Sequence, residues 1–383
     1  MRKFLKAKTL YALALLAALM IVDPSVVPAQ GPPPEQPDTN IDAATRQEVI
    51  GTLLKRLNES YVFPEVAEKM ASAVRERAGR GEYEQLSSAR AFAEKLTADL
   101  QAVSRDKHLR VRYSHQPIPE RGQRREPTPE EVAERQQYLA RMNHGFERIE
   151  RLPGNVGYMD FRGFMDEKAG AETVAAAFNF LANTDALIID LRKNGGGNPA
   201  MVALICSYLF GAEPVHLNSL YWREGNRTEE FWTLKEVAGK RYTGKDVYVL
   251  TSNRTFSGAE EFSYNLKNLK RATIVGETTG GGAHPGGKNR LHQHFGAFIP
   301  TGRAISPITK TNWEGTGVEP DVKAPADHAL KVAHLASVKK SIEKTTDEEL
   351  KGALRRLAET LQTELSQMQT KPTPPASAAQ GTK

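Results

Sequence analysis

Hydrophobic residues recur every three to four positions along residues 42–104 of this 383-residue chain, which predicts amphipathic helices. The apolar positions of three successive runs are Val49, Ile50, Leu53, Leu54 and Leu57; Val66, Met70 and Val74; and Phe92, Leu96, Leu100 and Val103. Pro64 stands where the second helix would begin, a position that favours proline because its missing N–H is not needed there. We expect residues 42–104 to form a small helical domain.

A different pattern begins at residue 105, where short apolar runs alternate with longer stretches of helical periodicity. The short runs lie at 109–113, 156–161, 186–191, 247–251 and 273–275, and the helical stretches at 129–142, 167–183, 199–210 and 258–270. Strands that alternate with helices are typical of an α/β fold with substantial parallel pairing. We therefore assign residues 105–345 to one α/β core.

The first 29 residues have the pattern of a signal peptide. Arg2, Lys3, Lys6 and Lys8 precede an apolar run at 10–22, and Val27-Pro28-Ala29 offers a small-residue cleavage site. The alternative is a membrane anchor, but the run is shorter than the roughly 20 residues that a spanning helix needs. We expect a mature protein that is periplasmic or extracellular and has no stable membrane span.

The remaining segments outside the core are predicted from composition and periodicity. Residues 30–41 are rich in proline and glutamine, which indicates a linker, and residues 370–383 are rich in Pro, Ala, Ser and Thr, which indicates a disordered tail. Residues 346–369 predict a C-terminal amphipathic helix with apolar positions Leu350, Leu354, Leu357, Leu361 and Leu365.

Charge and cysteine content narrow the classes of partner. The formal net charge is +6, but much of the excess lies in residues 1–29 and 370–383, so the body is nearly neutral and no nucleic-acid partner is expected. Cys206 is the single cysteine and lies in an apolar stretch, which favours a buried thiol over a nucleophile. Since no Cys/His cluster has zinc-ligand spacing, we expect neither a metal nor another cofactor.

Two apolar runs end in loops that could carry chemistry. The run at 186–191 leads into Asn194-Gly195-Gly196-Gly197, whose backbone N–H groups could face an oxyanion or merely form a tight turn. A phosphate loop is excluded because Asn198-Pro199 follows the glycines in place of Lys and Ser/Thr. The run at 247–251 leads to Ser257-Gly258, where Ser257 suits a helix cap or a nucleophile whose oxyanion meets the Gly258 N–H.

The loops together resemble a known family. The chain carries Asp190-Leu-Arg-x-Asn-x-Gly-Gly, Thr255-x-Ser-Gly-x-Glu and Val275-Gly-Glu-x-Thr-x-Gly in the order and spacing of the tail-specific, or C-terminal-processing, serine peptidases. Residues 300–303 and 317–321 also match that family, and residues 61–64 resemble the helical domain of interphotoreceptor retinoid-binding protein modules. The resemblance spans roughly residues 45–325 and implies a crotonase-like (ClpP/crotonase) ββα spiral core.

The chain departs from this family in two places. About 40 residues separate Tyr113 from Val156, too few for the PDZ domain that many members insert there. Ser–Lys members also place a lysine where this chain has Gly282, and Lys288 is the nearest lysine after it.

The tricorn-like branch of the family implies a different base. Its histidine and glutamate positions match His108 and Glu314, which suggests that His108 accepts the Ser257 proton and Glu314 orients it. Lys107 stands where that branch usually has a linking serine, so Lys107 could instead pair with Glu314. His284 and Lys288 remain alternative bases. Gly258 and Gly196 are the expected oxyanion-binding residues.

These inferences predict an exported serine peptidase that cleaves a peptide or protein substrate through a Ser257 acyl-enzyme. The alternative is a non-catalytic module of the interphotoreceptor retinoid-binding type, which binds a hydrophobic ligand or peptide without cleaving it. A homo-oligomer is compatible with either function.

Overall fold

A computed structural model describes residues 37–120 and 128–370. The predicted signal peptide, most of the predicted linker and the predicted tail beyond Thr370 lie outside the described residues. The described residues from Asp38 onward belong to one compact unit. Among them, no helix combines the length and apolar composition that crossing a bilayer requires.

The three predicted N-terminal helices are confirmed. They are α1 (Ala43–Ser60), α2 (Pro64–Gly79) and α3 (Ala89–Ser104). The side chains of Asp42 and Ser88 cap α1 and α3 by accepting hydrogen bonds from Thr45 N and Ala91 N.

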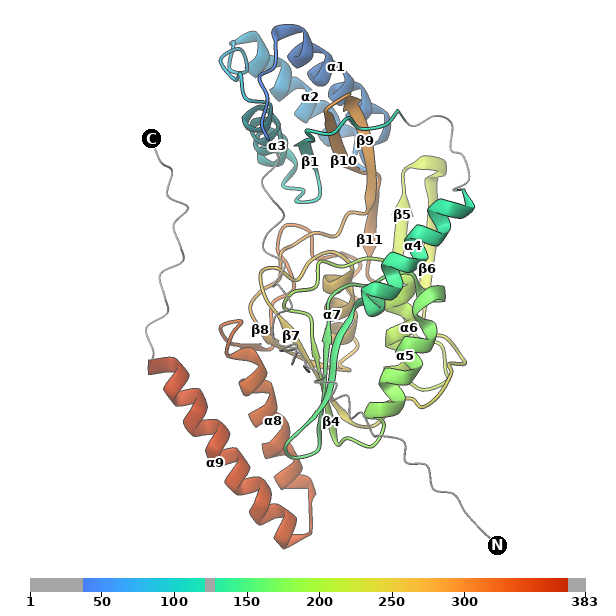
Figure 1. Cartoon of the computed structure of the whole chain (residues 1–383), viewed down its shortest axis with the longest axis vertical. Helices are drawn as coiled ribbons and strands as arrows, with labels where there is room; N and C mark the ends of the chain where they lie inside the picture. Colours follow the sequence, from blue (N-terminus) through green and yellow to red (C-terminus); the bar gives the residue numbers. More distant parts are fainter. Residues whose placement is uncertain (1–36, 121–127, 371–383) are drawn as a thin grey trace, which may run out of the picture. The chain divides into compact units, whose positions relative to one another are not determined.

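These helices do not close a core by themselves. They pack on an antiparallel sheet of order β1-β10-β9, formed by Arg110–Tyr113, Phe295–Pro300 and Gly286–His292. Leu291, Phe295 and Ile299 of the last two strands are buried in the same cluster as Leu53 and Phe92. The helical region predicted for residues 42–104 therefore depends on strands from much later in the chain (Figure 1).

A six-stranded sheet forms the centre of the α/β core. Its order is β12-β8-β7-β4-β3-β2, with β2 Phe146–Leu152, β3 Val156–Phe161, β4 Ala186–Asp190, β7 Asp246–Thr251, β8 Thr273–Gly276 and β12 Val322–Lys323. Every neighbouring pair is parallel except β2 and β3. The predicted α/β class with parallel pairing is confirmed, an arrangement consistent with the crotonase-like core that the resemblance implies.

Helices cover both faces of this sheet, as Figure 1 shows. One face packs against α5 (Glu167–Leu181), α6 (Pro199–Leu209) and α7 (Gly258–Asn268), and the other against α8 (Ala329–Lys344) and α9 (Glu348–Thr370). Successive strand residues alternate between the faces: Leu187 and Ile189 meet the first group, whereas Ile188 meets the second. Cys206 on α6 is buried in the first group, as predicted.

The C-terminal helices differ from the sequence expectation in two respects. Helix α8 was not anticipated, because its apolar residues spread around the helix and form no clear stripe. Helix α9 exists, but Leu350, expected on its apolar face, is 47% exposed, whereas Leu354, Leu361 and Leu365 are buried.

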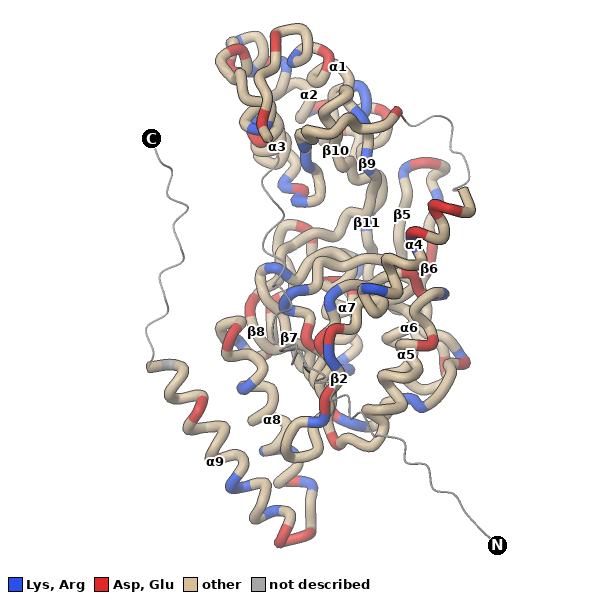
Figure 2. Tube along the Cα trace, viewed as in Figure 1, with Lys and Arg blue, Asp and Glu red and all other residues tan. Residues whose placement is uncertain are grey.

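The remaining elements lie around the sheet. They are the strands β5 (His216–Trp222), β6 (Arg227–Trp232) and β11 (Gly302–Ile305), in the antiparallel order β11-β5-β6, the helix α4 (Pro129–Arg141), and the 3₁₀ turns Asn143–Gly145 and Glu224–Asn226. Basic and acidic residues are interspersed along the described chain (Figure 2).

Candidate active site

Ser257 occupies a sharp turn between β7 and α7. Its φ of 54° and ψ of −123° lie outside the regions that residues with a Cβ usually adopt. Such strain persists only where surrounding contacts hold it, and it concentrates at functional sites. The turn puts Ser257 at the N-terminus of α7, and no side chain among the described residues hydrogen bonds to its hydroxyl.

Glu260 holds this turn against the glycine-rich loop that follows β8. Its fully buried carboxylate accepts hydrogen bonds from Ser257 N at 2.8 Å, Gly281 N at 2.6 Å and Gly282 N at 2.8 Å. The Thr279 hydroxyl donates a fourth bond at 2.5 Å. Burial raises the pKa of Glu260, and the four donors oppose that rise. The Glu260 carboxylate thus joins the Ser257 motif to the glycine-rich loop that follows β8.

The glycines after β4 approach Ser257 closely. A Cβ on Gly196, whose φ is 98°, would lie 2.8 Å from the Ser257 Cβ and 2.5 Å from Gly258 N, so only glycine fits there. The Gly196 N–H itself donates to Asn194 Oδ1 at 2.8 Å. By contrast, the N–H groups of Gly197 and Gly258 have no hydrogen-bond partner among the described residues.

His108 lies beside the residue that precedes Ser257. Its ring centroid is 4.6 Å from that of Phe256, and a Cβ on Gly282 would lie 2.7 Å from His108 Cε1. Its Nδ1 is buried without a hydrogen-bond partner among the described residues. Burial lowers the pKa of His108 to about 4, so the ring is neutral at pH 7. The ring makes no hydrogen bond to Ser257 in this structure.

Glu314 binds two backbone segments near His108. Its carboxylate accepts hydrogen bonds from Lys107 N at 3.2 Å and Ala283 N at 2.5 Å. The Lys107 ammonium instead donates to Gly280 O at 2.7 Å, so the Lys107–Glu314 pairing involves the lysine backbone and not its charge. Burial raises the pKa of Glu314, and the negative charge of the Asp106 carboxylate raises it further by a smaller amount.

His284 belongs to a buried network next to Glu314. Its Nδ1 lies 2.8 Å from Asp106 Oδ2 and 3.5 Å from Glu314 Oε2, and the Tyr61 hydroxyl donates to Asp106 at 3.0 Å. Ligand atoms of Asp106, His284 and Glu314 lie within 4.8 Å of one another, a spacing that a metal site also shows. Here, N–H and O–H donors already occupy the carboxylate oxygens, so the geometry is that of a hydrogen-bond network.

A cavity of about 310 Å³ opens beside Ser257. Its lining includes Ser257, Gly197, Gly258, Gly282, Ala283, Pro285, Leu220, Trp222, Phe231, Trp313 and Glu261. Neither His108 nor His284 lines it, although Gly282, which His108 contacts, and both chain neighbours of His284 do. The exposed Lys288 on β9 is also absent from the lining.

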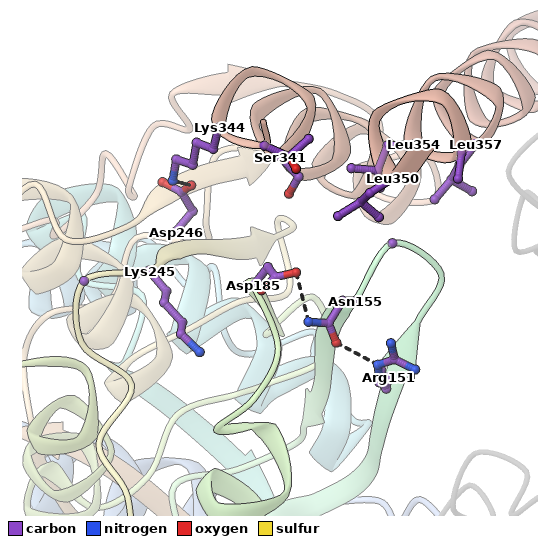
Figure 3. Close-up of a pocket in the computed structure, with 14 residues that line it drawn as sticks. Arg151, Asn155, Asp185, Lys245, Asp246, Ser341, Lys344, Leu350, Leu354 and Leu357 are labelled. Carbon is purple, nitrogen blue, oxygen red and sulfur yellow. Dashed lines mark hydrogen bonds and ion pairs between the residues drawn. The ribbon is translucent and has the colours of Figure 1, made fainter. Parts of the chain in front are cut away.

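A second, larger cavity of about 580 Å³ is lined by residues of α8 and α9 (Figure 3), and Ser257 is not among its lining residues. Its polar groups bind one another: Asn155 donates to Asp185 at 2.9 Å and accepts from Arg151 at 2.7 Å. Figure 3 shows Lys344 reaching Asp246, which it meets at 2.6 Å. Cavity size therefore does not identify the reactive site.

Comparison with known proteins gives the family. Residues 155–324 match the pattern of Peptidase family S41, and residues 43–146 match that of the N-terminal domain of Peptidase_S41 in eukaryotic IRBP. These matches support a hydrolase of the peptidase class. It belongs to peptidase family S41, which confirms the resemblance drawn from its motifs.

Three solved structures are similar to this chain to different degrees. A provisionally assigned peptidase from Parabacteroides merdae is 18% identical, with 73% of this chain and 90% of that chain covered and a TM-score of 0.50. A lipoprotein from Streptococcus agalactiae is 14% identical over 76% and 96%, with a TM-score of 0.49. The photosystem II D1 C-terminal processing protease is 16% identical over 74% and 94%, with a TM-score of 0.45. The first of these shares the fold of this chain.

Ser257, His108, Glu314 and His284 were predicted from the sequence, but several residues that surround them were not. Asp106 and Tyr61, which hold His284, and Gly197, whose N–H is free of partners among the described residues, were not chosen. Glu260 stood within a motif but received no role. Its place three residues after Ser257, in a capping-box spacing, was the available signal.

Proposed function

We propose that this protein is an exported serine peptidase that hydrolyses peptide bonds through an acyl-enzyme on Ser257. Membership of peptidase family S41 supports peptide hydrolysis. The observation that carries the assignment of the nucleophile is the strained turn at Ser257, which presents a hydroxyl beside two N–H groups that lack partners among the described residues.

The chemistry follows from these positions. The Ser257 Oγ attacks the carbonyl carbon of the scissile bond while a base takes its proton, and the carbonyl oxygen becomes an oxyanion. The same proton then passes to the leaving amine as the C–N bond breaks, and the acyl-enzyme remains. Water next attacks the acyl carbon and gives its proton to the base, which returns it to Ser257 Oγ.

His108 is the base that the geometry favours. It touches Phe256 and Gly282, which flank the Ser257 turn, and its low pKa keeps it able to accept a proton at pH 7. His284 is turned toward Asp106, and Lys288 is exposed on β9. Glu314 acts as a positioning residue, because it holds the backbone of Lys107 immediately before His108.

Gly258 and Gly197 are the donors that we propose for the oxyanion. The predicted partner, Gly196, already donates its N–H to Asn194, which argues against it. Gly196 instead permits the close approach of its loop to Ser257. Backbone donors fixed in this way stabilise charge that develops in the transition state without reorganisation.

The test uses Ser257→Ala and a fluorophosphonate probe that reacts with activated serines. We expect wild type to be labelled and to cleave a casein-derived peptide mixture, and Ser257→Ala to lose at least about 10⁴-fold in activity. The variant should unfold at the same temperature within a few degrees. Cleavage by Ser257→Ala at the wild-type rate would refute the assignment. Absent labelling together with tight binding of an apolar ligand would favour the binding-module alternative.

Export is a separate part of the proposal. It rests on the charged, apolar and small-residue segments of residues 1–29. N-terminal sequencing of the protein from the periplasm or medium of an expressing bacterium should begin at Gln30. An intact N-terminus retained in the cytoplasm would contradict export.

A further inference from the structure

One acidic side chain beside Ser257 has no role in the chemistry described above. Glu261 follows Glu260 on α7, is only 4% exposed and lines the same cavity as Ser257. Its Oε1 is enclosed without a hydrogen-bond partner among the described residues, and the residue itself contributes to the cavity wall. A buried carboxyl without a partner is costly, so its presence in a cavity points to a ligand that supplies the partner.

Two buried amide side chains near Glu261 also lack close hydrogen-bond partners among the described residues. Asn218 on β5 is fully buried, and neither its amide oxygen nor its amide nitrogen has a partner among the described residues. Asn265, one helical turn after Glu261, is buried with its Nδ2 likewise unpaired. Burial raises the pKa of Glu261 to about 8, and the neighbouring Asn218 amide, which faces this carboxyl without closing a short hydrogen bond to it, acts in the opposite direction.

The rest of the cavity suits a long side chain with an apolar stem. Leu220, Trp222, Phe231 and Trp313 supply apolar and aromatic walls. The charged residues that line it are Glu167, Glu229 and Glu261, and neither lysine nor arginine is among the described lining residues. Lysine and arginine bury their methylene stems along apolar surface and present a cation at the end.

We propose that this cavity is the pocket for the substrate residue whose carbonyl Ser257 attacks, and that Glu261 selects lysine or arginine there. The substrate cation donates hydrogen bonds to the Glu261 carboxylate, while its stem lies against the aromatic walls. When the cation binds, Glu261 releases its proton to solvent. The ion pair between the Glu261 carboxylate and the substrate cation then takes the place of a buried, protonated carboxyl that had no partner. This proposal rests on the proposed peptidase function and names its substrate class.

The experiment compares two fluorogenic peptides that differ at this one residue, lysine in one and the isosteric, neutral norleucine in the other. In wild type we expect kcat/KM for the lysine peptide to exceed that for the norleucine peptide by at least about 50-fold. Glu261→Gln should lower the lysine value by about 100-fold and leave the norleucine value within threefold. Glu230→Gln is the matched control, because Glu230 is an exposed glutamate on β6 outside the cavity lining and should change neither value.

The outcomes separate this proposal from the peptidase assignment. Cleavage of norleucine at least as fast as lysine, with Ser257 labelled by fluorophosphonate, overturns the role of Glu261 and leaves the peptidase standing. An unchanged lysine-to-norleucine ratio in folded Glu261→Gln overturns it as well. If neither peptide is cleaved and Ser257 is not labelled, both proposals fail. Should Glu261→Gln not fold, the wild-type ratio and competitive inhibition by n-butylammonium decide the question.

Discussion

The cavity beside Ser257 and the larger cavity under α9 differ in how their polar groups are satisfied. Under α9, the Lys245 ammonium donates to two backbone carbonyls, both at 2.8 Å, and Lys344 donates to Asp246. Near Ser257, a carboxyl oxygen of Glu261 and the Nδ1 of the adjacent His108 are buried without partners among the described residues. The cavity under α9 is a packing gap whose polar groups are paired, whereas the cavity beside Ser257 leaves the Glu261 carboxyl available to a ligand.

This contrast separates stability from function. A group that is already paired contributes to folding, and its removal should change the free energy of unfolding. A group kept unpaired costs stability until substrate arrives, so its removal should change turnover. The following variants test that division, and Glu260 is the one expected to affect both properties.

Removal of the proposed base should have the largest effect. His108→Ala should lower kcat/KM by about 10²–10⁴-fold, because general-base catalysis contributes on that scale. Some stability should be lost too, because the ring packs against Phe256 and Phe298, so kcat/KM is measured on the folded fraction. His292→Ala, a histidine on β9, serves as control, and steady-state assays on both variants provide the measurement. Full activity in His108→Ala would move the base role to His284 or Lys288.

Glu260 should affect both properties, because it is paired and also holds the reactive turn. Glu260→Ala leaves three backbone N–H groups and one hydroxyl without their acceptor, and we expect a loss of at least about 3 kcal/mol in unfolding free energy. The kcat should fall along with it. Urea denaturation and kcat measured on the folded fraction give the two values. A stable variant with normal kcat would show that the turn does not need this carboxylate.

Leu354 belongs to the cavity under α9 and should affect stability alone. Leu354→Ala removes a side chain that is 5% exposed and should cost about 2–4 kcal/mol. The kcat/KM of the folded protein should stay within twofold of wild type. Leu350→Ala, at a 47% exposed position of the same helix, should cost less than about 0.5 kcal/mol. A large loss of activity in folded Leu354→Ala would link this cavity to the site.

The pH dependence should report the burial of His108. Because its pKa in the folded protein is lowered to about 4, the ring accepts a proton down to that pH, and kcat/KM should hold from pH 7 to about 5 and fall near pH 4. The unfolded chain binds this proton near pH 6.5, so His108 lowers stability progressively as pH falls from 6.5 to 4. A pH–rate profile with its acid limb near 6.5 would contradict a buried base.

Lys344 should show the smallest effect. Its side chain is 60% exposed, and Lys340 also binds Asp246, at 2.7 Å. Lys344→Ala should therefore cost less than about 1 kcal/mol and leave kcat/KM unchanged. Urea denaturation at low and high salt measures the difference, which salt should reduce. A loss above about 2 kcal/mol would mean that the pair acts as a buried one.

Much of this protein was determined by local sequence. The periodicity of apolar residues located α1 to α3, helical stretches between the apolar runs located α5 to α7, and Glu- and Arg-rich composition located α4. Glycines with a serine at the ends of strands marked the loops of the site. Helix periodicity and turn chemistry act within a few residues, so both can be read without tertiary contacts. Helix α8 escaped because its apolar residues are spread around it and contact both the sheet and α9.

Only the tertiary structure decided how the marked residues divide the chemistry. Three sets of contacts join segments that are far apart in the sequence. They are the contact of His108 with Phe256, the four hydrogen bonds of Glu260 and the pairing of His284 with Asp106. Sequence spacing cannot predict these contacts or the side-chain orientations that they fix. The unpaired oxygen of Glu261 is likewise visible only once β5 and α7 enclose it. Burial and hydrogen-bond satisfaction are properties of the packed chain, and they set which groups stay free to react.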